Sequence, residues 1–203
     1  MLKVGLTGSI AVGKSYVCVI FRELGAHILD ADQTARDVVK PGTRGLRQIV
    51  ENFGESILNS KGELDRPKMA AIVFADEDKR QILNSIIHPL VFEEQDKWIE
   101  EREKQDPHAI AIVDAALMIE SGGYRRFDRL IVVWCEPEIQ LKRLMLRDDL
   151  ARADAEKRIA SQMPQNEKKR YADHLIDTSN SFEDTREQTL DVFEKLRRAE
   201  KAE

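Results

Sequence analysis

Five short apolar runs along the chain alternate with longer segments whose apolar residues recur at helical spacing. The apolar runs cover residues 2–7, 27–29, 109–113, 130–134 and 174–176. The run Leu130–Trp134 contains no polar position, which is typical of a strand buried on both faces of a parallel sheet. Helical patterns cover residues 15–24, 35–39, 46–53, 67–74, 79–87, 90–103, 137–147, 153–162 and 182–198. The alternation predicts an α/β fold with a parallel five-stranded sheet flanked by helices.

The loop after the first run matches a phosphate-binding pattern. Residues 8–15 read Gly-Ser-Ile-Ala-Val-Gly-Lys-Ser, a full match to G-x-x-x-x-G-K-[ST] between a strand pattern and a helix pattern. Backbone N–H groups at a helix N-terminus carry partial positive charge, and glycines let them approach phosphate oxygens closely. Lys14 would reach the β- and γ-phosphates, and Ser15 would ligate Mg²⁺. We expect a nucleoside-triphosphate site; the alternative is a glycine-containing turn that happens to precede Lys-Ser.

Composition narrows the class of protein. The 203 residues carry a net charge of −5, with 42% hydrophobic and 34% charged residues, so the chain lacks the basic balance of a nucleic-acid or membrane surface. No apolar run reaches the roughly 18 residues of a membrane span. Because the phosphate loop begins at residue 8, we expect no leader peptide. Cys18 and Cys135 lie in apolar runs, which favours reduced core thiols and a cytoplasmic protein.

The spacing of the strands suggests how the chain is organised. About 75 residues separate the second and third apolar runs, which is too long for a simple crossover connection. We therefore expect a helical insertion that binds a substrate. The expected arrangement is a single P-loop NTPase-type domain with a nucleotide-binding core (about 1–32, 108–136 and 163–203), a helical insertion (about 33–107) and a lid (about 137–162).

Acidic residues follow the second and third strand patterns, and each has a structural and a functional interpretation. Asp30, with Gln33 three residues later, resembles a capping box, and Asp32 would then lie in the first helical turn. Because ligands of open parallel sheets bind beyond the strands' carboxyl ends, Asp32 could instead accept a proton from an attacking hydroxyl. Arg36, one turn on, either pairs with Asp32 or binds an anionic substrate. Asp114 is either a turn residue or a Mg²⁺ ligand opposite the phosphate loop.

Two basic positions and one histidine complete the candidates. Arg143 and Arg147 lie at i and i+4 beside an apolar stripe, so they form either a solvated helix face or a lid that closes over the triphosphate. His88 precedes Pro89, which predicts that a helix ends at residue 87 and another begins at residue 90. A lone histidine at a helix end is more often structural than catalytic.

Taken together, these segments resemble the dephospho-coenzyme A kinase family over roughly residues 3 to 180. The segments that carry the resemblance are Gly5-Leu6-Thr7-Gly8, Gly13-Lys14-Ser15, Asp30-Ala31-Asp32, Ala35-Arg36, His88-Pro89, residues 114–120, Gln140-Leu141-Lys142-Arg143, Arg147-Asp148, Ala172-Asp173 and Ile176-Asp177. The family transfers the ATP γ-phosphate to the ribose 3′-hydroxyl of dephospho-coenzyme A in the last step of coenzyme A synthesis. The resemblance implies a transferase with a five-stranded core, a helical substrate domain and a lid.

The resemblance also implies roles for individual residues. Asp32 corresponds to the general base, and Arg36, His88, Leu117 and Glu120 would line the dephospho-coenzyme A pocket. Lys14 and Arg143 would act with Asp32 in catalysis, and Ser15 and Asp114 would hold Mg²⁺. The residues expected to bind ATP are Gly8, Ala11, Val12, Gly13, Lys14, Ser15, Tyr16, Arg143 and Arg147, and the segment 178–181 would approach the adenine. The implied partners are small molecules only, ATP and dephospho-coenzyme A, in a monomer or small homo-oligomer.

The chain departs from the family pattern at three places. Ser9, Ala11 and Val12 stand in a loop that is usually richer in glycine. The segment 116–120 lacks the proline that the family commonly has there, and Thr178 replaces the usual asparagine after the last strand.

Two other functions fit part of the pattern. Another small-molecule kinase, such as one acting on nucleoside monophosphates, would share the fold and the lid and differ in its acceptor. A nucleotide-dependent switch is less consistent, because the Asn-Lys-x-Asp and Asp-x-x-Gly segments typical of guanine-specific switches are absent from the sequence. A preference for ATP over GTP would favour the kinase.

Overall fold

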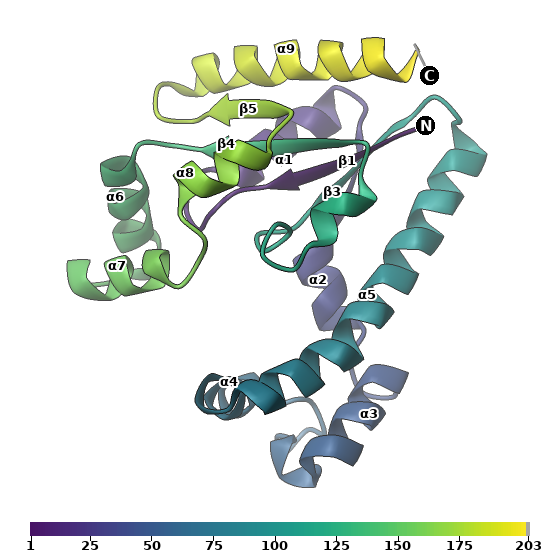
Figure 1. Ribbon diagram of the computed structural model, residues 1–203, viewed down its shortest axis with the longest axis vertical. Coiled ribbons are helices and arrows are strands. Elements are labelled where there is room, and N and C mark those ends of the chain that lie inside the picture. Colours follow the sequence, from purple (N-terminus) through teal and green to yellow (C-terminus); the bar gives the residue numbers. More distant parts are fainter. Residues whose placement is uncertain (202–203) are drawn as a thin grey trace. The chain divides into compact units, whose positions relative to one another are not determined.

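A computed structural model describes residues 1–201 and contains one parallel sheet of five strands in the order β2-β3-β1-β4-β5 (Figure 1). The strands are β1 Leu2–Thr7, β2 His27–Asp30, β3 Ile110–Asp114, β4 Arg129–Trp134 and β5 His174–Asp177. All four strand pairings are parallel. Each strand overlaps one of the predicted apolar runs, so the prediction of a parallel five-stranded α/β fold is confirmed.

By contacts between residues, the chain divides into two compact units: residues 1–30 together with the chain from Glu100 onward, and Ala31–Ile99. The first unit contains the sheet. Its helices are α1 Lys14–Glu23, α6 Pro137–Asp148, α7 Arg152–Ala160, α8 Gln165–Lys168 and α9 Phe182–Glu200, with 3₁₀ turns η2 Gly123–Arg126 and η3 Lys169–Tyr171. Helix α8 escaped prediction because four residues are too few to show a helical period.

One face of the sheet is covered by α1 and α9. Alternate residues of β1 (Leu2, Val4 and Leu6) are completely buried, and they belong to the same apolar cluster as Phe21 of α1 and Leu196 of α9. Parallel sheets bury both faces, and the intervening positions of β1 face the other way. A Cβ atom added at Gly5 would lie 2.6 Å from Met118 Sδ, so the segment after β3 packs directly on that second face.

The second unit is helical and has a core of its own. It contains α2 Ala31–Asp37, α3 Arg44–Phe53, η1 Glu55–Ile57, α4 Arg66–Ala75 and most of α5 Glu77–Gln105. The buried residues at its centre are Val39, Ile49, Ile57 and Met69. Side chains of Thr43 and Asp65 cap α3 and α4 by accepting hydrogen bonds from Leu46 N (3.2 Å) and Lys68 N (3.0 Å), which satisfies otherwise unpaired N–H groups.

The prediction that a helix ends at residue 87 is wrong, because α5 runs through Pro89 without a break. A proline inside a helix removes one hydrogen bond and crowds the preceding turn, at a cost of about 3 kcal/mol. Leu90 and Val91, directly after the proline, are 7% and 8% exposed, so burial of apolar side chains offsets that cost. Tertiary packing therefore overrides the local preference of the His88–Pro89 pair.

Pro89→Ala should raise the free energy of unfolding by roughly 1–3 kcal/mol, because alanine restores the missing main-chain hydrogen bond and relieves the crowded turn. Urea denaturation of the variant and the unaltered protein measures the difference. Pro89→Gly is the control, since glycine restores the N–H but adds backbone entropy, and it should gain less. A Pro89→Ala protein of lower stability would mean that the packing of Leu90 and Val91 requires the proline.

Candidate active site

The carboxyl ends of the central strands bring the phosphate loop and Asp114 together. In the sheet register Leu6 lies beside Asp114, and the loop follows β1 directly. The Lys14 ammonium forms an ion pair with Asp114 Oδ1, and both side chains are largely buried. Asp114 therefore faces the phosphate loop, as its position at the end of a strand pattern suggested.

The loop residues adopt the conformation that a phosphate cradle requires. Gly13 has φ +86° immediately before α1 begins at Lys14, so the first free N–H groups of α1 open onto the loop. A Cβ atom at Gly8 would lie 2.5 Å from the Val133 carbonyl oxygen of β4, a position that only glycine can occupy. Ala11 also has a positive φ of 60°, a conformation that costs an L-residue about 1–2 kcal/mol and that the more usual glycine would adopt freely.

Glutamine side chains hold the outer side of the loop. Gln140 Nε2 donates to the Ile10 carbonyl at 2.8 Å, and the Ile10 N–H donates to Gln162 Oε1 at 2.8 Å. Gln165 Nε2 donates to Gln140 Oε1 at 2.7 Å, and its Oε1 accepts from Cys135 N at 3.0 Å. Gln140, at the centre of this chain of hydrogen bonds, is 2% exposed.

A second anchor comes from the turn after β5. The buried Thr178 hydroxyl donates to the Val12 carbonyl at 2.6 Å. Arg143 of α6 donates from Nη1 to Thr178 Oγ1 (2.9 Å) and from Nη2 to the Thr178 carbonyl (2.7 Å). Thr178, where the family usually has asparagine, thus links a lid arginine candidate to the phosphate loop.

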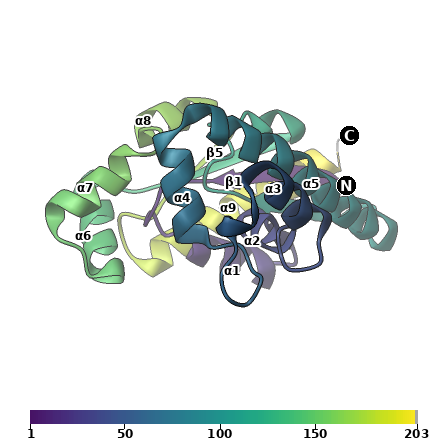
Figure 2. The ribbon, with the colours of Figure 1, turned by 90° about the horizontal axis from the view of Figure 1, so that it is seen from below.

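The second lid arginine candidate is arranged differently. Arg147 binds its neighbour Asp148 through Nε (2.8 Å) and Nη2 (3.1 Å), and Arg158 of α7 donates to the same carboxylate at 2.7 Å. The hydrogen bond from Arg147 lowers the pKa of Asp148. Helices α6 and α7 lie side by side (Figure 2), with Leu141, Leu144 and Ala155 buried between them. The apolar stripe predicted beside the two arginines is therefore a packing surface.

Cys18 lies behind the ion pair, and its thiol donates to Asp114 Oδ2 at 3.4 Å. Burial and, next, the Asp114 charge raise the pKa of the Cys18 thiol to about 12. The thiol stays protonated at neutral pH, in agreement with the prediction of a reduced core cysteine. Cys135 is also buried and free.

Tyr16 and Ser15 occupy the first turn of α1. The Tyr16 hydroxyl donates to the Phe182 carbonyl at 3.3 Å, and the two rings meet edge to face with centroids 4.8 Å apart. Tyr16 thereby joins α1 to the start of α9. The Ser15 side chain is exposed at the mouth of the loop.

Glu120, expected in the acceptor pocket, forms an ion pair with a buried lysine. Its Oε1 lies 2.9 Å from the ammonium of Lys168, which is fully buried, and accepts from Met163 N at 3.2 Å. Lys168 also donates to the Ala116 carbonyl at 2.8 Å, so it fixes both ends of the segment after β3. Leu117, within that segment, is 50% exposed.

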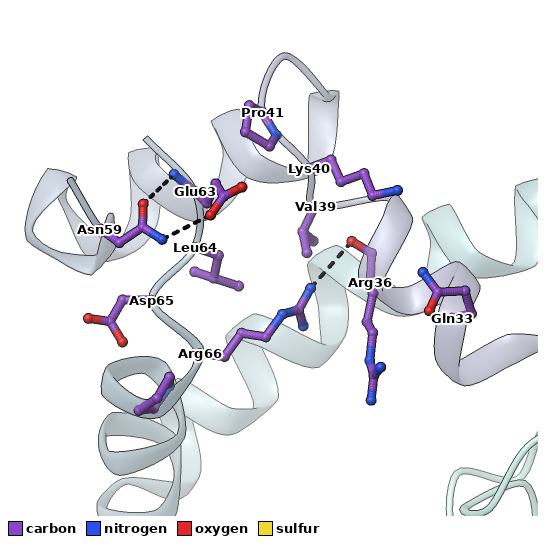
Figure 3. A pocket seen from close by; sticks show the side chains of 11 residues that line it. Gln33, Arg36, Val39, Lys40, Pro41, Asn59, Glu63, Leu64, Asp65 and Arg66 are labelled. Carbon is purple, nitrogen blue, oxygen red and sulfur yellow. Dashed lines mark hydrogen bonds between the residues drawn. The ribbon is translucent and has the colours of Figure 1, made fainter. Parts of the chain in front are cut away.

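Three expected acceptor-site residues lie in the helical unit. Asp32 occupies the first turn of α2, as predicted, and Arg36 follows one turn later. Arg36 is exposed, and its carbonyl oxygen accepts a hydrogen bond from Arg66 Nη2 at 3.4 Å (Figure 3). His88 lies inside α5, half-buried, with its ring 6.2 Å from that of Phe92, and burial lowers the pKa of His88.

The hydroxyl of Ser9, in the phosphate loop, lines a cavity. Ser9 Oγ is buried and lacks a hydrogen-bond partner within residues 1–201. With Trp134, Gln140 and Lys169 it lines a cavity of about 440 Å³, where the Lys169 ammonium sits 3.4 Å from the centre of the Trp134 ring. Ser9 thus faces this cavity rather than the interior of the sheet.

A parallel five-stranded sheet with this loop between its central strand and α1 defines the class of P-loop kinases. The family model for dephospho-CoA kinase matches residues 2–184, and the chain belongs to that family. It is 44% identical over 197 residues to a dephospho-CoA kinase domain-containing protein of Danio rerio (97% of this chain, 86% of that protein). It is 42% identical over 202 residues to the dephospho-CoA kinase of Geobacillus kaustophilus (98% and 99%). The solved structure of the Campylobacter jejuni dephospho-CoA kinase is similar, with 29% identity, a TM-score of 0.72 and 97% and 98% coverage.

Thr178→Val should raise KM for ATP about tenfold, because the buried Val12 carbonyl loses its donor and Arg143 loses an acceptor. Steady-state kinetics with varied ATP measures the change. Thr178→Ser, which keeps the hydroxyl, is the matched control and should behave like the unaltered protein. An unchanged KM in Thr178→Val would show that the loop holds its conformation without this hydrogen bond.

Proposed function

We propose that this protein phosphorylates the ribose 3′-hydroxyl of dephospho-CoA with ATP, yielding CoA and ADP in the last step of CoA biosynthesis. The observation that carries the proposal is the phosphate loop, with Lys14 at its end, in a chain that matches the dephospho-CoA kinase family over residues 2–184. Relatives that match nearly the full length of the chain are named dephospho-CoA kinase. The class of the fold alone would leave the acceptor open.

The loop and its cations account for binding of the triphosphate. Backbone N–H groups of residues 8–15 and the Lys14 ammonium bind the β- and γ-phosphates. Lys14 pairs with Asp114 in the structure, so phosphate oxygens share or replace that carboxylate as its partner. Arg143, already directed to the loop through Thr178, stabilises charge on the transferring group, and Arg147 joins it after leaving Asp148. Tyr16 and residues 178–181 border the nucleoside.

Ser15 and Asp114 fit a magnesium site. Mg²⁺ prefers oxygen ligands and commonly takes one or two from protein, with phosphates and water completing the octahedron. The Ser15 hydroxyl is exposed beside the loop, and Asp114 presents its carboxylate to Lys14. Within residues 1–201 no cluster of three or more His, Cys, Asp or Glu could hold a metal unaided, so the nucleotide would bring most of the ligands. The ion would neutralise charge on the phosphates.

Asp32 serves as the base in this proposal. The 3′-oxygen of the acceptor forms a bond to the γ-phosphorus, the bond from that phosphorus to the bridging oxygen of ADP breaks, and the hydroxyl proton passes to Asp32. In a loose transition state the proton leaves late, so Asp32 chiefly orients the hydroxyl. Asp32 lies in the first turn of α2, where a carboxylate complements the helix dipole.

The remaining acceptor residues contribute by different means. Arg36 binds an anionic part of the acceptor, and His88 and Leu117 border it. Glu120 acts through its ion pair with Lys168, which fixes the segment that carries Leu117. The α6–α7 pair closes over the site, which excludes water and limits ATP hydrolysis.

The proposal includes a cytoplasmic monomer or small homo-oligomer that acts on small molecules without nucleic-acid or membrane partners. Its support is the net charge of −5 and two free, buried cysteines. Over residues 1–201, no helix has the length and apolar character needed to cross a bilayer.

Release of ADP from ATP and Mg²⁺ tests the reaction and its acceptor together. We expect release with dephospho-CoA, with CoA as product, and only background release with AMP, CMP or no acceptor. Release with a monophosphate instead would be consistent with the proposed ATP site but would refute dephospho-CoA as the acceptor. GTP in place of ATP should give a lower rate.

Asp32→Asn should lower kcat roughly 100-fold or more while KM for ATP stays nearly unchanged, because the amide cannot take the proton. Asp37→Asn is the matched control: it lies on the same helix and pairs with Lys40 at 2.6 Å, and it should retain kcat. Near-normal turnover by Asp32→Asn would remove Asp32 from the role of base.

A further inference from the structure

Two consecutive residues in the connection between α7 and α8 bind two different parts of the site (Figure 1). Gln162 Oε1 accepts a hydrogen bond from Ile10 N, in the phosphate loop, at 2.8 Å. The N–H of Met163 donates to Glu120 Oε1, in the segment after β3, at 3.2 Å. The α7–α8 connection, residues 161–164, therefore joins the phosphate loop to the segment that carries Leu117. All of these residues belong to the first compact unit.

Both ends of the α6–α7 pair hold the same residue of the phosphate loop. The Ile10 carbonyl accepts from Gln140 Nε2, near the start of α6, at 2.8 Å. The Ile10 N–H is bound by Gln162, two residues after the end of α7. The Ile10 side chain also packs against the apolar cluster between the two helices. A displacement of α6 and α7 over the loop therefore acts directly on Gln162 and on Met163 beside it.

The contacts on the acceptor side of the connection are hard to separate. Glu120 Oε1 lies 2.9 Å from the ammonium of Lys168, which is fully buried and donates to the Ala116 carbonyl at 2.8 Å. The same carbonyl accepts from the Thr7 hydroxyl at 3.2 Å. Breaking such an ion pair would leave a buried charge uncompensated, which is strongly destabilising. A displacement at Met163 is therefore passed on to the segment after β3.

We propose that Gln162 is a positioning residue that couples the two substrates, so that ATP and dephospho-CoA each strengthen the binding of the other. This inference rests on the proposed function, in which α6 and α7 close over the triphosphate and Leu117 borders the acceptor. Gln162 acts through Ile10 and Met163 rather than by contact with the reacting atoms.

The coupling follows from two states of the α7–α8 connection. In the engaged state, Gln162 holds Ile10 and Met163 holds Glu120, so the phosphate loop and the acceptor segment are both in place. In the disengaged state both lose this support. Each substrate binds the engaged state more tightly, and each therefore raises the population of the state that the other requires.

Equilibrium binding with a non-hydrolysable ATP analogue separates the coupling from the chemistry. Calorimetry measures Kd for dephospho-CoA in the presence of Mg²⁺, without the β,γ-imido analogue of ATP and then with the analogue at saturation. In the unaltered protein the analogue should lower this Kd at least about fivefold, the lower end of the usual range for coupled sites. Gln162→Met should bring the ratio of the two values close to one, because methionine has a similar length but offers Ile10 N no oxygen. Kd without the analogue should stay nearly unchanged.

Gln188→Met is the matched control. Gln188 Oε1 also accepts from a main-chain N–H, that of Asp177 at 2.9 Å, so each methionine variant removes a hydrogen bond to the main chain. Urea denaturation measures the structural cost of each. Gln188 binds the end of β5 rather than the phosphate loop, so Gln188→Met should keep the ratio of the unaltered protein.

Gln162→Glu is the conservative variant, because it keeps an oxygen for Ile10 N. Its added charge weakens binding of the analogue to a similar extent with and without dephospho-CoA, so the ratio should be retained. If Gln162→Met does not fold, Gln162→Asn replaces it, since asparagine is one methylene too short to reach Ile10, and the same outcomes apply.

The possible results separate this inference from the proposed function. An analogue that leaves Kd for dephospho-CoA unchanged in the unaltered protein would overturn the coupling, as would a Gln162→Met protein that keeps the full ratio. An equal loss in Gln162→Met and Gln188→Met would show a general structural effect and would also overturn it. An unaltered protein that does not phosphorylate dephospho-CoA would refute the proposed function, whereas phosphorylation without coupling would refute only this inference.

Discussion

A phosphate loop can direct its N–H groups inward only if its outward-facing main-chain groups find partners elsewhere. Each buried carbonyl left without a hydrogen-bond donor would cost about 1–3 kcal/mol of folding free energy. In this protein the Ile10 carbonyl is bound by Gln140 and the Val12 carbonyl by Thr178. The cradle thus depends on side chains more than 100 residues away, one from α6 and one from the turn after β5.

The parallel sheet makes this delivery possible. Every strand ends at the same edge, so the connections after β1, β3, β4 and β5 meet there although they are distant in sequence. Lys14 follows β1, and Asp114 is the last residue of β3. Gln140 follows β4, and Thr178 follows β5. The helical unit, in contrast, is built around its own apolar core.

The sequence predicted the parts of the structure that leave a local or periodic signal. Strands buried on both faces appear as apolar runs, and the loop has a fixed pattern of residues. The hydrogen bonds that join Gln140, Gln162 and Thr178 to the phosphate loop connect distant residues and produce no such signal. The burial of Lys168 produces none either. The helix end expected at residue 87 was wrong because a local rule for proline was applied where packing of Leu90 and Val91 decides.

Gln140 and Arg143 lie three residues apart on α6, and both reach the phosphate loop, one directly and the other through Thr178. A rotation of α6 would break both connections. The conformation of the loop and the orientation of α6 are therefore coupled. By thermodynamic linkage, a nucleotide that favours the cradle conformation must favour the matching orientation of α6 by the same free energy. Occupancy of the phosphate site is thereby communicated to the helix that carries the arginines.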